Sequence, residues 1–245
     1  MELKIDDATY WKDCINAIHS ILDEGEFNIS ENGISLKSIN NTGISMVSFF
    51  IPNKAFSKYE IDKPKSIGIN IDSLSKVLNN KRDEQLIIKD NNNKISFELI
   101  SQNAKRKYKL PMIDVRKDGN KEPNVNFESY IEIKSDLLKA TLKDASLISA
   151  GNILFKIDKN EFRITANTDF VELEEVIIDN ADFKIQSNKA TSVAFSLEYL
   201  MKIVSACPPD SDIKLSLKTK EPIKLDYAIR DAKFVYYLAP YVIDE

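Results

Sequence analysis

The spacing of apolar residues predicts helices and strands in the same order in both halves of the chain. A stripe with helical spacing (Trp11, Ile15, Ile18, Leu22) opens the first half, and alternating or continuous apolar runs follow it. The elements expected there are a helix at 9–23, strand alternation at 28–36 with a turn at 31–33, strands at 46–51 and 67–71, a helix capped by Asp72, strands at 86–89 and 95–100, and a strand at 105–112.

The second half repeats this succession. It is expected to contain a helix capped by Ser135, strands at 153–157, 161–166 and 171–178, a helix opening near Ser196, and strands at 213–217, 223–229 and 233–238. Each half therefore predicts two helices packed on antiparallel strands, an α+β arrangement.

Short blocks of sequence recur at a nearly constant offset. Residues 10–12 align with 137–139 at an offset of 127, and residues 66–71 align with 192–197 at an offset of 126. Residues 104–111 align with 232–240 at an offset that starts at 128. The repeat predicts two similar domains, 1–115 and 128–245, joined by a polar loop at 116–127. A fold used twice without a catalytic cluster indicates a scaffold that gains its function through symmetry.

Composition narrows the possible functions. The chain has 245 residues and a net charge of −4, which argues against a surface coated with positive charge but permits a local basic strip. A single histidine excludes a Ser-His-Asp triad or a two-histidine metal site within one chain, and none of the six glycines forms a phosphate loop. We therefore expect no enzymatic activity, cofactor or metal, although an enzyme that uses only carboxylates stays open. No apolar run reaches the ~20 residues that span a membrane, and two cysteines without a secretory signal favour an intracellular protein.

Lysines occupy equivalent positions on the expected helices. Lys12 matches Lys139 at an offset of 127, Lys76 matches Lys202 at an offset of 126, and Lys143 shares a face with Lys139. The expected DNA-binding residues are Lys12, Lys76, Lys81, Arg82, Lys139, Lys143 and Lys202. If the four helices line one surface, their lysines suit sequence-independent contact with phosphates. The alternative is that they are ordinary solvated helix residues.

Two expected strands carry opposite charge. Lys105, Arg106, Lys107 and Lys109 make one strand basic, and Glu172, Glu174 and Glu175 make another acidic. The charges either protect exposed sheet edges or pair copies of the chain head to tail as the subunit interface of a ring. With helices about 10 Å across, twelve helices from three chains leave a bore of roughly 28 Å, whereas eight leave roughly 15 Å. Only the larger ring admits duplex DNA, which is about 20 Å wide.

Four segments resemble the proliferating cell nuclear antigen (PCNA) family of sliding clamps, in its archaeal form. They are residues 32–36, 68–71, 110–115 and 237–240. The resemblance implies a DNA clamp fold closing into a trimeric ring, with two further clamp subunits, that encircles double-stranded DNA and acts as a polymerase processivity factor. It also implies that DNA polymerase, a clamp loader, flap endonuclease and ligase bind through short peptide motifs. The location would be cytoplasmic and nucleoid-associated in an archaeon, or nuclear in a eukaryote.

The family binds partner peptides in an apolar pocket beside the interdomain loop. By position, this pocket would use Ile39, Ile44, Met46, Val125, Phe127, Pro222, Tyr237, Leu238, Ala239 and Pro240. Tyr241, Met201 and Ser205 stand where the family often has basic residues, and 117–122 is more polar than usual. These departures leave open a second interpretation, a clamp paralogue in a heterotrimeric or repair-specific ring.

Overall fold

A computed structural model describes residues 1–78, 83–91, 93–115, 121–179, 183–187 and 189–242. The chain divides into two compact units, which are described separately. Unit 1 comprises residues 1–41, 47–120 and 228–234, and unit 2 comprises 42–46, 121–227 and 235–245.

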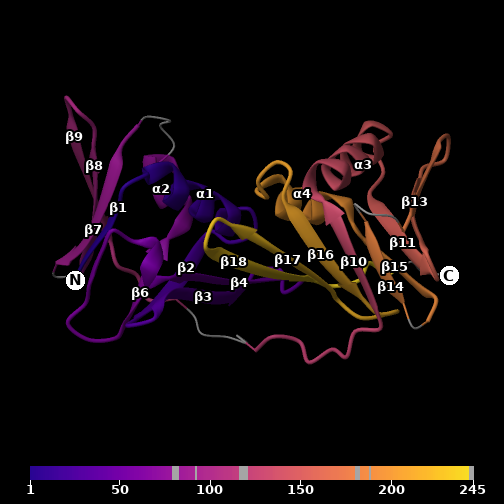
Figure 1. Ribbon diagram of the computed structural model, residues 1–245, viewed down its shortest axis with the longest axis horizontal. Coiled ribbons are helices and arrows are strands. Elements are labelled where there is room, and N and C mark those ends of the chain that lie inside the picture. The colour runs from indigo at the N-terminus through magenta and orange to yellow at the C-terminus, as the bar shows by residue number, and fades with distance from the viewer. Residues whose placement is uncertain (79–82, 92, 116–120, 180–182, 188, 243–245) are drawn as a thin grey trace. The chain divides into compact units, whose positions relative to one another are not determined.

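The first half of the chain folds in the order β1 (Glu2–Ile5), α1 (Ala8–His19), β2 (Glu24–Ser30), β3 (Gly33–Ile39), β4 (Ser45–Pro52), the 3-10 turn η1 (Asn53–Ala55), β5 (Lys58–Glu60), β6 (Lys65–Asn70), α2 (Ile71–Leu78), β7 (Gln85–Asn91), β8 (Lys94–Ile100) and β9 (Lys105–Pro111). Figure 1 shows α1 and α2 lying side by side in unit 1.

The second half follows the same order without the 3-10 turn. Its elements are β10 (Ser129–Lys134), α3 (Ser135–Leu147), β11 (Asn152–Asp158), β12 (Glu161–Asn167), β13 (Glu172–Ile178), β14 (Lys184–Ser187), β15 (Thr191–Ser196), α4 (Leu197–Ser205), β16 (Asp212–Leu217), β17 (Ile223–Ile229) and β18 (Ala232–Leu238). The duplication predicted from sequence is confirmed, since the described residues of each half form two helices and nine strands in matching order.

The sheet order repeats as well. In the first half β5, β1, β7, β8 and β9 form one sheet, and in the second half β14, β10, β16 and β17 adjoin in the corresponding order. The remaining strands also adjoin in matching order, which is β4-β3-β2-β6 in the first half and β13-β12-β11-β15 in the second. Apolar side chains fill each unit, with Trp11 beside Phe27 and Phe56 in unit 1 and Phe155 beside Phe162 and Phe195 in unit 2.

The two halves differ in what covers their last strands. β9 neighbours only β8, and β13 neighbours only β12, so both are edge strands. Their counterparts β18 and β4 instead lie beside each other. Within unit 1 the Phe49 and Phe234 rings lie 5.1 Å apart, and within unit 2 the Ala239 N–H donates to the Ile44 carbonyl at 2.8 Å. Both contacts fit one antiparallel register, in which Phe49 faces Phe234 and Ile44 faces Ala239.

Three local predictions were wrong. The first helix ends at His19 rather than at residue 23, and the Ser20 N–H closes its last turn on the Asn16 carbonyl at 3.0 Å. Asp72 is not the cap of α2, because the Asn70 side chain accepts from the Ser73 N–H at 2.8 Å. Ser135 does not cap α3 either.

The Ser135 hydroxyl donates instead to the Pro208 carbonyl at 2.8 Å, so it links the start of α3 to the segment after α4. Sequence also missed five strands, β1, β5, β10, β14 and β15, each of six residues or fewer. Runs this short give only two or three alternations of apolar and polar residues, too few to stand out.

Candidate functional site

The four helices carry no net charge. Their lysines are Lys12, Lys76, Lys139, Lys143 and Lys202, and their acidic residues are Asp13, Asp72, Asp136, Asp144 and Glu198. A helical layer with equal numbers of both charges gives a weak phosphate attraction overall. Any contact with DNA therefore depends on which lysines are free to reach a phosphate.

Lys12 does not fit its predicted role. The residue is 6% exposed, whereas a phosphate contact requires an accessible ammonium group. The reason is the width of the buried face of α1, where eight of twelve residues are buried and little more than Thr9, Asp13 and Asn16 faces outward. The prediction that Lys12 lies away from the apolar stripe is wrong.

The equivalent Lys139 is half-buried. Its Nζ donates to the Cys207 carbonyl at 2.5 Å, so it joins α3 to the residues after α4. Carbonyls at a helix C-terminus lack helical partners, and a lysine there satisfies one of them. Lys139 therefore has a structural role in unit 2.

Two equivalent lysines form equivalent ion pairs within their helices. Lys76 lies 2.6 Å from Asp72, and Lys202 lies 2.6 Å from Glu198. Such exposed pairs are weak, so both ammonium groups can exchange partners readily. Lys143 is exposed and has no carboxylate partner among the described residues. Lys81 and Arg82 lie outside the described residues.

The last residues of the predicted interdomain loop, 123–127, border a cavity of about 550 Å³ in unit 2. Three of the predicted pocket residues, Val125, Phe127 and Tyr237, line it. The remaining lining residues are Pro123, Asn124, Tyr130, Lys214, Ser216, Lys224 and Asp226. The cavity therefore combines an apolar side from 123–127 with a polar side from β16 and β17.

Tyr237 is nearly covered in this cavity. It is 6% exposed, and its hydroxyl donates to Glu122 Oε2 at 3.1 Å. Burial, reinforced by the neighbouring Glu122 carboxylate, raises the pKa of Tyr237, so the phenol stays neutral. Segment 121–127 is thus held on this tyrosine.

The other predicted pocket residues divide into two groups. Met46 and Leu238 are 3% and 1% exposed and belong to the core, so they offer little surface to a bound peptide. The residues that remain partly or fully exposed are Ile39, Ile44, Pro222, Ala239 and Pro240. Of these, Ile44 and Ala239 lie together through their backbone hydrogen bond.

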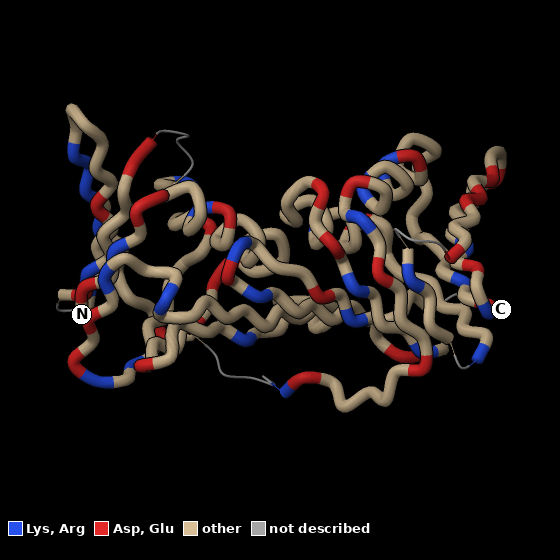
Figure 2. The backbone as a smooth tube through the Cα atoms, in the orientation of Figure 1, with Lys and Arg blue, Asp and Glu red and all other residues tan. Residues whose placement is uncertain are grey.

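The edge strands β9 and β13 have matching form and opposite charge. Each has seven residues with the same alternation of exposed and covered positions. Figure 2 shows lysine and arginine along β9 and acidic residues along β13. Both strands thus offer an unpaired backbone edge next to a strongly charged row.

Glu98 of β8 partly neutralises the row on β9. Its carboxylate accepts from Lys105 and Lys107 at 2.7 and 2.6 Å, and its side chain is 6% exposed. The hydrogen bonds from Lys105 and then Lys107 lower the pKa of Glu98 from 4.5 to about 2. Lys109 has no carboxylate partner among the described residues, so it is the β9 cation most available to another molecule.

Replacing Glu98 with glutamine is expected to lower the free energy of unfolding at pH 7, with a difference from the parent protein that shrinks as the pH falls from about 4.5 towards 2. A carboxylate whose pKa is lowered by folding stabilises the protein above its unfolded pKa, and this stabilisation disappears as the folded form is protonated. Denaturant unfolding at several pH values measures it, with exposed Glu31→Gln as control. A difference that persists undiminished at pH 2 would contradict the role of this ion pair.

Arg106 differs from the lysines beside it. Its Nη2 donates to both carboxylate oxygens of Glu84, at 2.6 and 2.8 Å, and the Glu84 side chain is 2% exposed. The Glu84 carbonyl also accepts from the Ala8 N–H at the start of α1, at 2.8 Å. Arg106 therefore neutralises a buried carboxylate within its own unit.

The internal repeat supplies a register for the two edges. The Asn53 N–H donates to the Asn32 carbonyl, and the Asp179 N–H donates to the Asn160 carbonyl, both at 3.0 Å. This match equates β3 with β12 at an offset of 128 and β4 with β13 at an offset of 126. β18 matches β9 at an offset of 128. If β13 and β9 of two copies paired in the β4–β18 register, Glu172 would lie opposite Lys109, Glu174 opposite Lys107 and Glu175 opposite Arg106. Within the chain, Glu174 already pairs with Arg163, and Glu175 accepts a hydrogen bond from the Thr141 hydroxyl.

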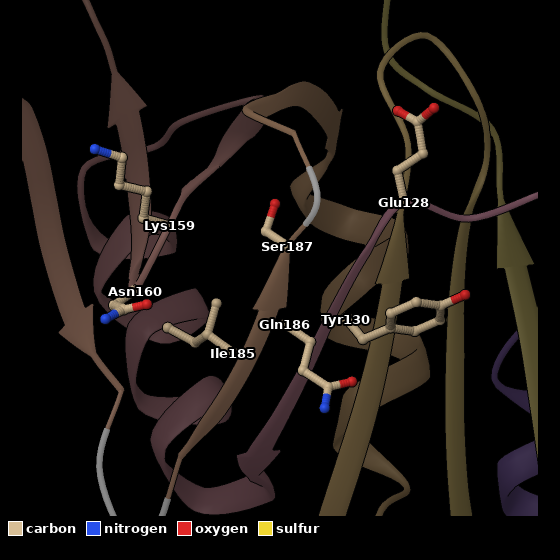
Figure 3. A pocket seen from close by; sticks show the side chains of 7 residues that line it. All are labelled: Glu128, Tyr130, Lys159, Asn160, Ile185, Gln186 and Ser187. Atoms are coloured by element: carbon tan, nitrogen blue, oxygen red, sulfur yellow. The ribbon is translucent and has the colours of Figure 1, made fainter.

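Unit 2 also has a shallow hollow of about 680 Å³ beside edge strand β14 (Figure 3). Lys159 and Asn160 of the turn between β11 and β12 form one side, and Ile185, Gln186 and Ser187 form the floor. Among the described residues there is no group of three histidine, cysteine or acidic side chains that could hold a metal ion. Within the same residues, every helix is too short or too polar to cross a membrane.

Both halves of the chain match domains of a known protein family. Residues 1–121 match the model for the N-terminal domain of proliferating cell nuclear antigen, and residues 121–242 match the model for its C-terminal domain. A DNA polymerase sliding clamp of Thermococcus fumicolans is 31% identical over 99% of both chains, and one of Thermococcus gammatolerans is 29% identical over 98% of both.

Solved structures show the same fold. PCNA from Thermococcus kodakaraensis superposes with a TM-score of 0.91 at 21% identity, covering 98% of this chain and 99% of that one. PCNA from Entamoeba histolytica gives a TM-score of 0.88 at 25% identity over 98% of both chains. With both family domains matched in order along nearly the whole length, the chain belongs to the proliferating cell nuclear antigen family.

Proposed function

We propose that the protein is a DNA sliding clamp, a processivity factor that encircles duplex DNA and tethers a polymerase to its template. The observation that carries this proposal is the clamp fold used twice, with two unpaired edges of opposite charge that match in length and alternation. A clamp needs no catalytic centre, because a closed ring stays on DNA by topology and raises the local concentration of whatever binds it.

The internal repeat supports closure of the ring. Within the chain, β18 pairs with β4, and the same relation between copies would pair β9 with β13 of the next copy, which we call the β9–β13 interface. A heterologous contact that repeats by rotation closes into a ring. Three copies supply twelve helices and a bore of roughly 28 Å, enough for a duplex about 20 Å wide.

Exposed lysines of the helices would supply weak phosphate contacts. Lys76, Lys143 and Lys202 remain candidates, whereas Lys12 is buried and Lys139 holds the Cys207 carbonyl. Because the layer has no net charge, the ring would hold DNA loosely, which suits sliding.

Replacing Lys143 with alanine is expected to reduce the steepness of the salt dependence of DNA affinity. One lost phosphate contact lowers the slope of log K against log salt by about 0.9. Fluorescence anisotropy at several salt concentrations measures it. The matched control is Lys156→Ala on β11, where buried Phe155 and Ile157 face the opposite side. An unchanged slope for Lys143→Ala would remove that residue from the DNA-facing set.

Partner proteins would bind by short peptide motifs beside segment 121–127. The apolar residues Val125 and Phe127 and the partly exposed Ile44 and Ala239 support this, with DNA polymerase, clamp loader, flap endonuclease and ligase as the expected partners. Because Glu122 holds the Tyr237 hydroxyl, an entering peptide would first have to displace this hydrogen bond.

A primer-extension assay with polymerase and clamp loader tests the proposed function. Longer products in the presence of the protein are expected, and unchanged product length would contradict it. Light scattering of the protein alone then separates a self-sufficient trimer from the second interpretation, a paralogue that forms rings only with related subunits.

A further inference from the structure

Phe170 is the most exposed large apolar side chain among the described residues, at 95%. It lies in the connection between β12 and β13, immediately before the acidic edge strand. Val171, Val176 and Ile178 are also 47%, 42% and 60% exposed, so apolar surface gathers along this edge. A cluster of this kind on an otherwise well-packed protein marks a surface that another molecule covers.

The turn that presents Phe170 is well defined. The Thr168 N–H donates to the Val171 carbonyl at 2.9 Å, and the Thr168 hydroxyl oxygen accepts from the N–H groups of Phe170 and Val171 at 3.4 and 3.1 Å. These bonds hold the backbone while the ring points outward. The backbone at Phe170 therefore needs little further ordering on binding.

The internal repeat identifies what Phe170 would meet. At the offset of 126 that relates β4 to β13, Phe170 corresponds to Ile44. Within unit 2, Ile44 lies beside Ala239, at the end of β18. Ala239 corresponds to Pro111 at the end of β9, at an offset of 128. Phe170 therefore lacks its counterpart's neighbour within the chain, and a second copy of the chain supplies one.

Pro111 is a suitable partner. It is exposed, and as proline it has no N–H to extend the ladder, so the contact there must be made by side chains. The backbone beyond it is fixed, because Met112 donates to the Asn93 carbonyl at 2.8 Å and Ile113 donates to the Gly68 carbonyl at 3.0 Å. A flat phenyl ring against a rigid pyrrolidine ring excludes water with little loss of entropy.

We infer that Phe170 is the apolar anchor of the β9–β13 interface, packing on Pro111 of the neighbouring copy next to the facing charges of Lys109 and Glu172. This inference depends on the proposed ring. Phe170 precedes Glu172 by two residues, so the same contact brings it near Lys109, which faces Glu172 in the transferred register. The Lys109–Glu172 pair then selects the partner edge, and the anchor contributes affinity.

Analytical ultracentrifugation of Phe170→Ala tests the inference. We expect the concentration at which half the protein is assembled to rise about tenfold or more, as for the loss of a central aromatic contact. Leu147→Ala is the matched control, since Leu147 is 74% exposed but lies at the last position of α3 rather than on β9 or β13. Because Phe170 packs on little within its own chain, circular dichroism and thermal unfolding of the monomer should not change.

If the two side chains touch, the loss of assembly affinity in the double variant Phe170→Ala, Pro111→Ala should be smaller than the sum of the losses in the two single variants. An assembly as tight as the parent's in Phe170→Ala would overturn the anchor while leaving the clamp function intact. A parent protein that stays monomeric at every concentration would overturn the β9–β13 interface itself, and the anchor with it.

Discussion

Replacing Lys109 with glutamate is expected to dissociate the assembled protein, and adding Glu172→Lys in the same chain is expected to restore it. In the register transferred from β4 and β18, Lys109 of one copy faces Glu172 of the next. The single variant puts two carboxylates opposite each other at every interface, which should weaken each contact about tenfold or more. The double variant exchanges the charges and restores attraction at each interface.

Light scattering over a range of concentrations measures this prediction. Lys109 suits it because it has no carboxylate partner among the described residues, so its reversal leaves the ion pairs of Glu98 in place. Glu172→Lys alone should dissociate the assembly as well. If the double variant fails to assemble, the two residues do not face each other. If both single variants assemble as the parent protein does, β9 and β13 are not the interface.

Replacing Arg106 with alanine is expected to lower the free energy of unfolding by about 3–5 kcal/mol, because it leaves a buried carboxylate without a partner. The Glu84 side chain is 2% exposed, and both of its carboxylate oxygens accept from Arg106. Glu84→Gln should cost less, since the Arg106 side chain is 21% exposed and can reach water. Chemical denaturation measures both changes.

Lys156→Ala on β11 is the control for this pair, because Lys156 is exposed and has no carboxylate partner among the described residues. Equal losses of stability for Arg106→Ala and Lys156→Ala would contradict a special role for the buried ion pair. Arg106 is consequently a poor position for testing assembly. Its reversal to glutamate would destabilise unit 1 before it could report on an interface.

The order of elements and the duplication could be predicted from sequence, because matched apolar blocks recur at a fixed spacing. The exact equivalences could not. The offset between the halves is 128 for β3 and β12 but 126 for β4 and β13, since the connections between these strands differ in length. A single offset of 127 would shift the facing residues, placing Glu174 rather than Glu172 opposite Lys109 and Glu172 opposite Pro111. The hydrogen bonds of Asn53 and Asp179 were needed to resolve it.

The sequence also identified only part of the candidate site. Charge alone identified β9 and β13, because strongly charged strands are disfavoured inside sheets and favoured at their edges. Charge could not separate Arg106 from Lys109, since the partner of Arg106 is Glu84, distant in sequence. The prediction for Lys12 was wrong for a related reason. Helical periodicity gives the direction of a side chain, but it does not show how much of the helix is covered by neighbouring elements. Phe170 was missed altogether, as a lone aromatic residue in a turn has no periodic signal.

The most direct measurement is the retention of the loaded protein on circular and linear DNA of the same sequence. After loading by a clamp loader on nicked circles, gel filtration should recover the protein with the DNA. Linearising the circles should release it within the time of the experiment, and blocking the DNA ends with bound protein should prevent release. Equal retention on open linear and circular DNA would contradict a sliding ring, because only a topological link distinguishes the two.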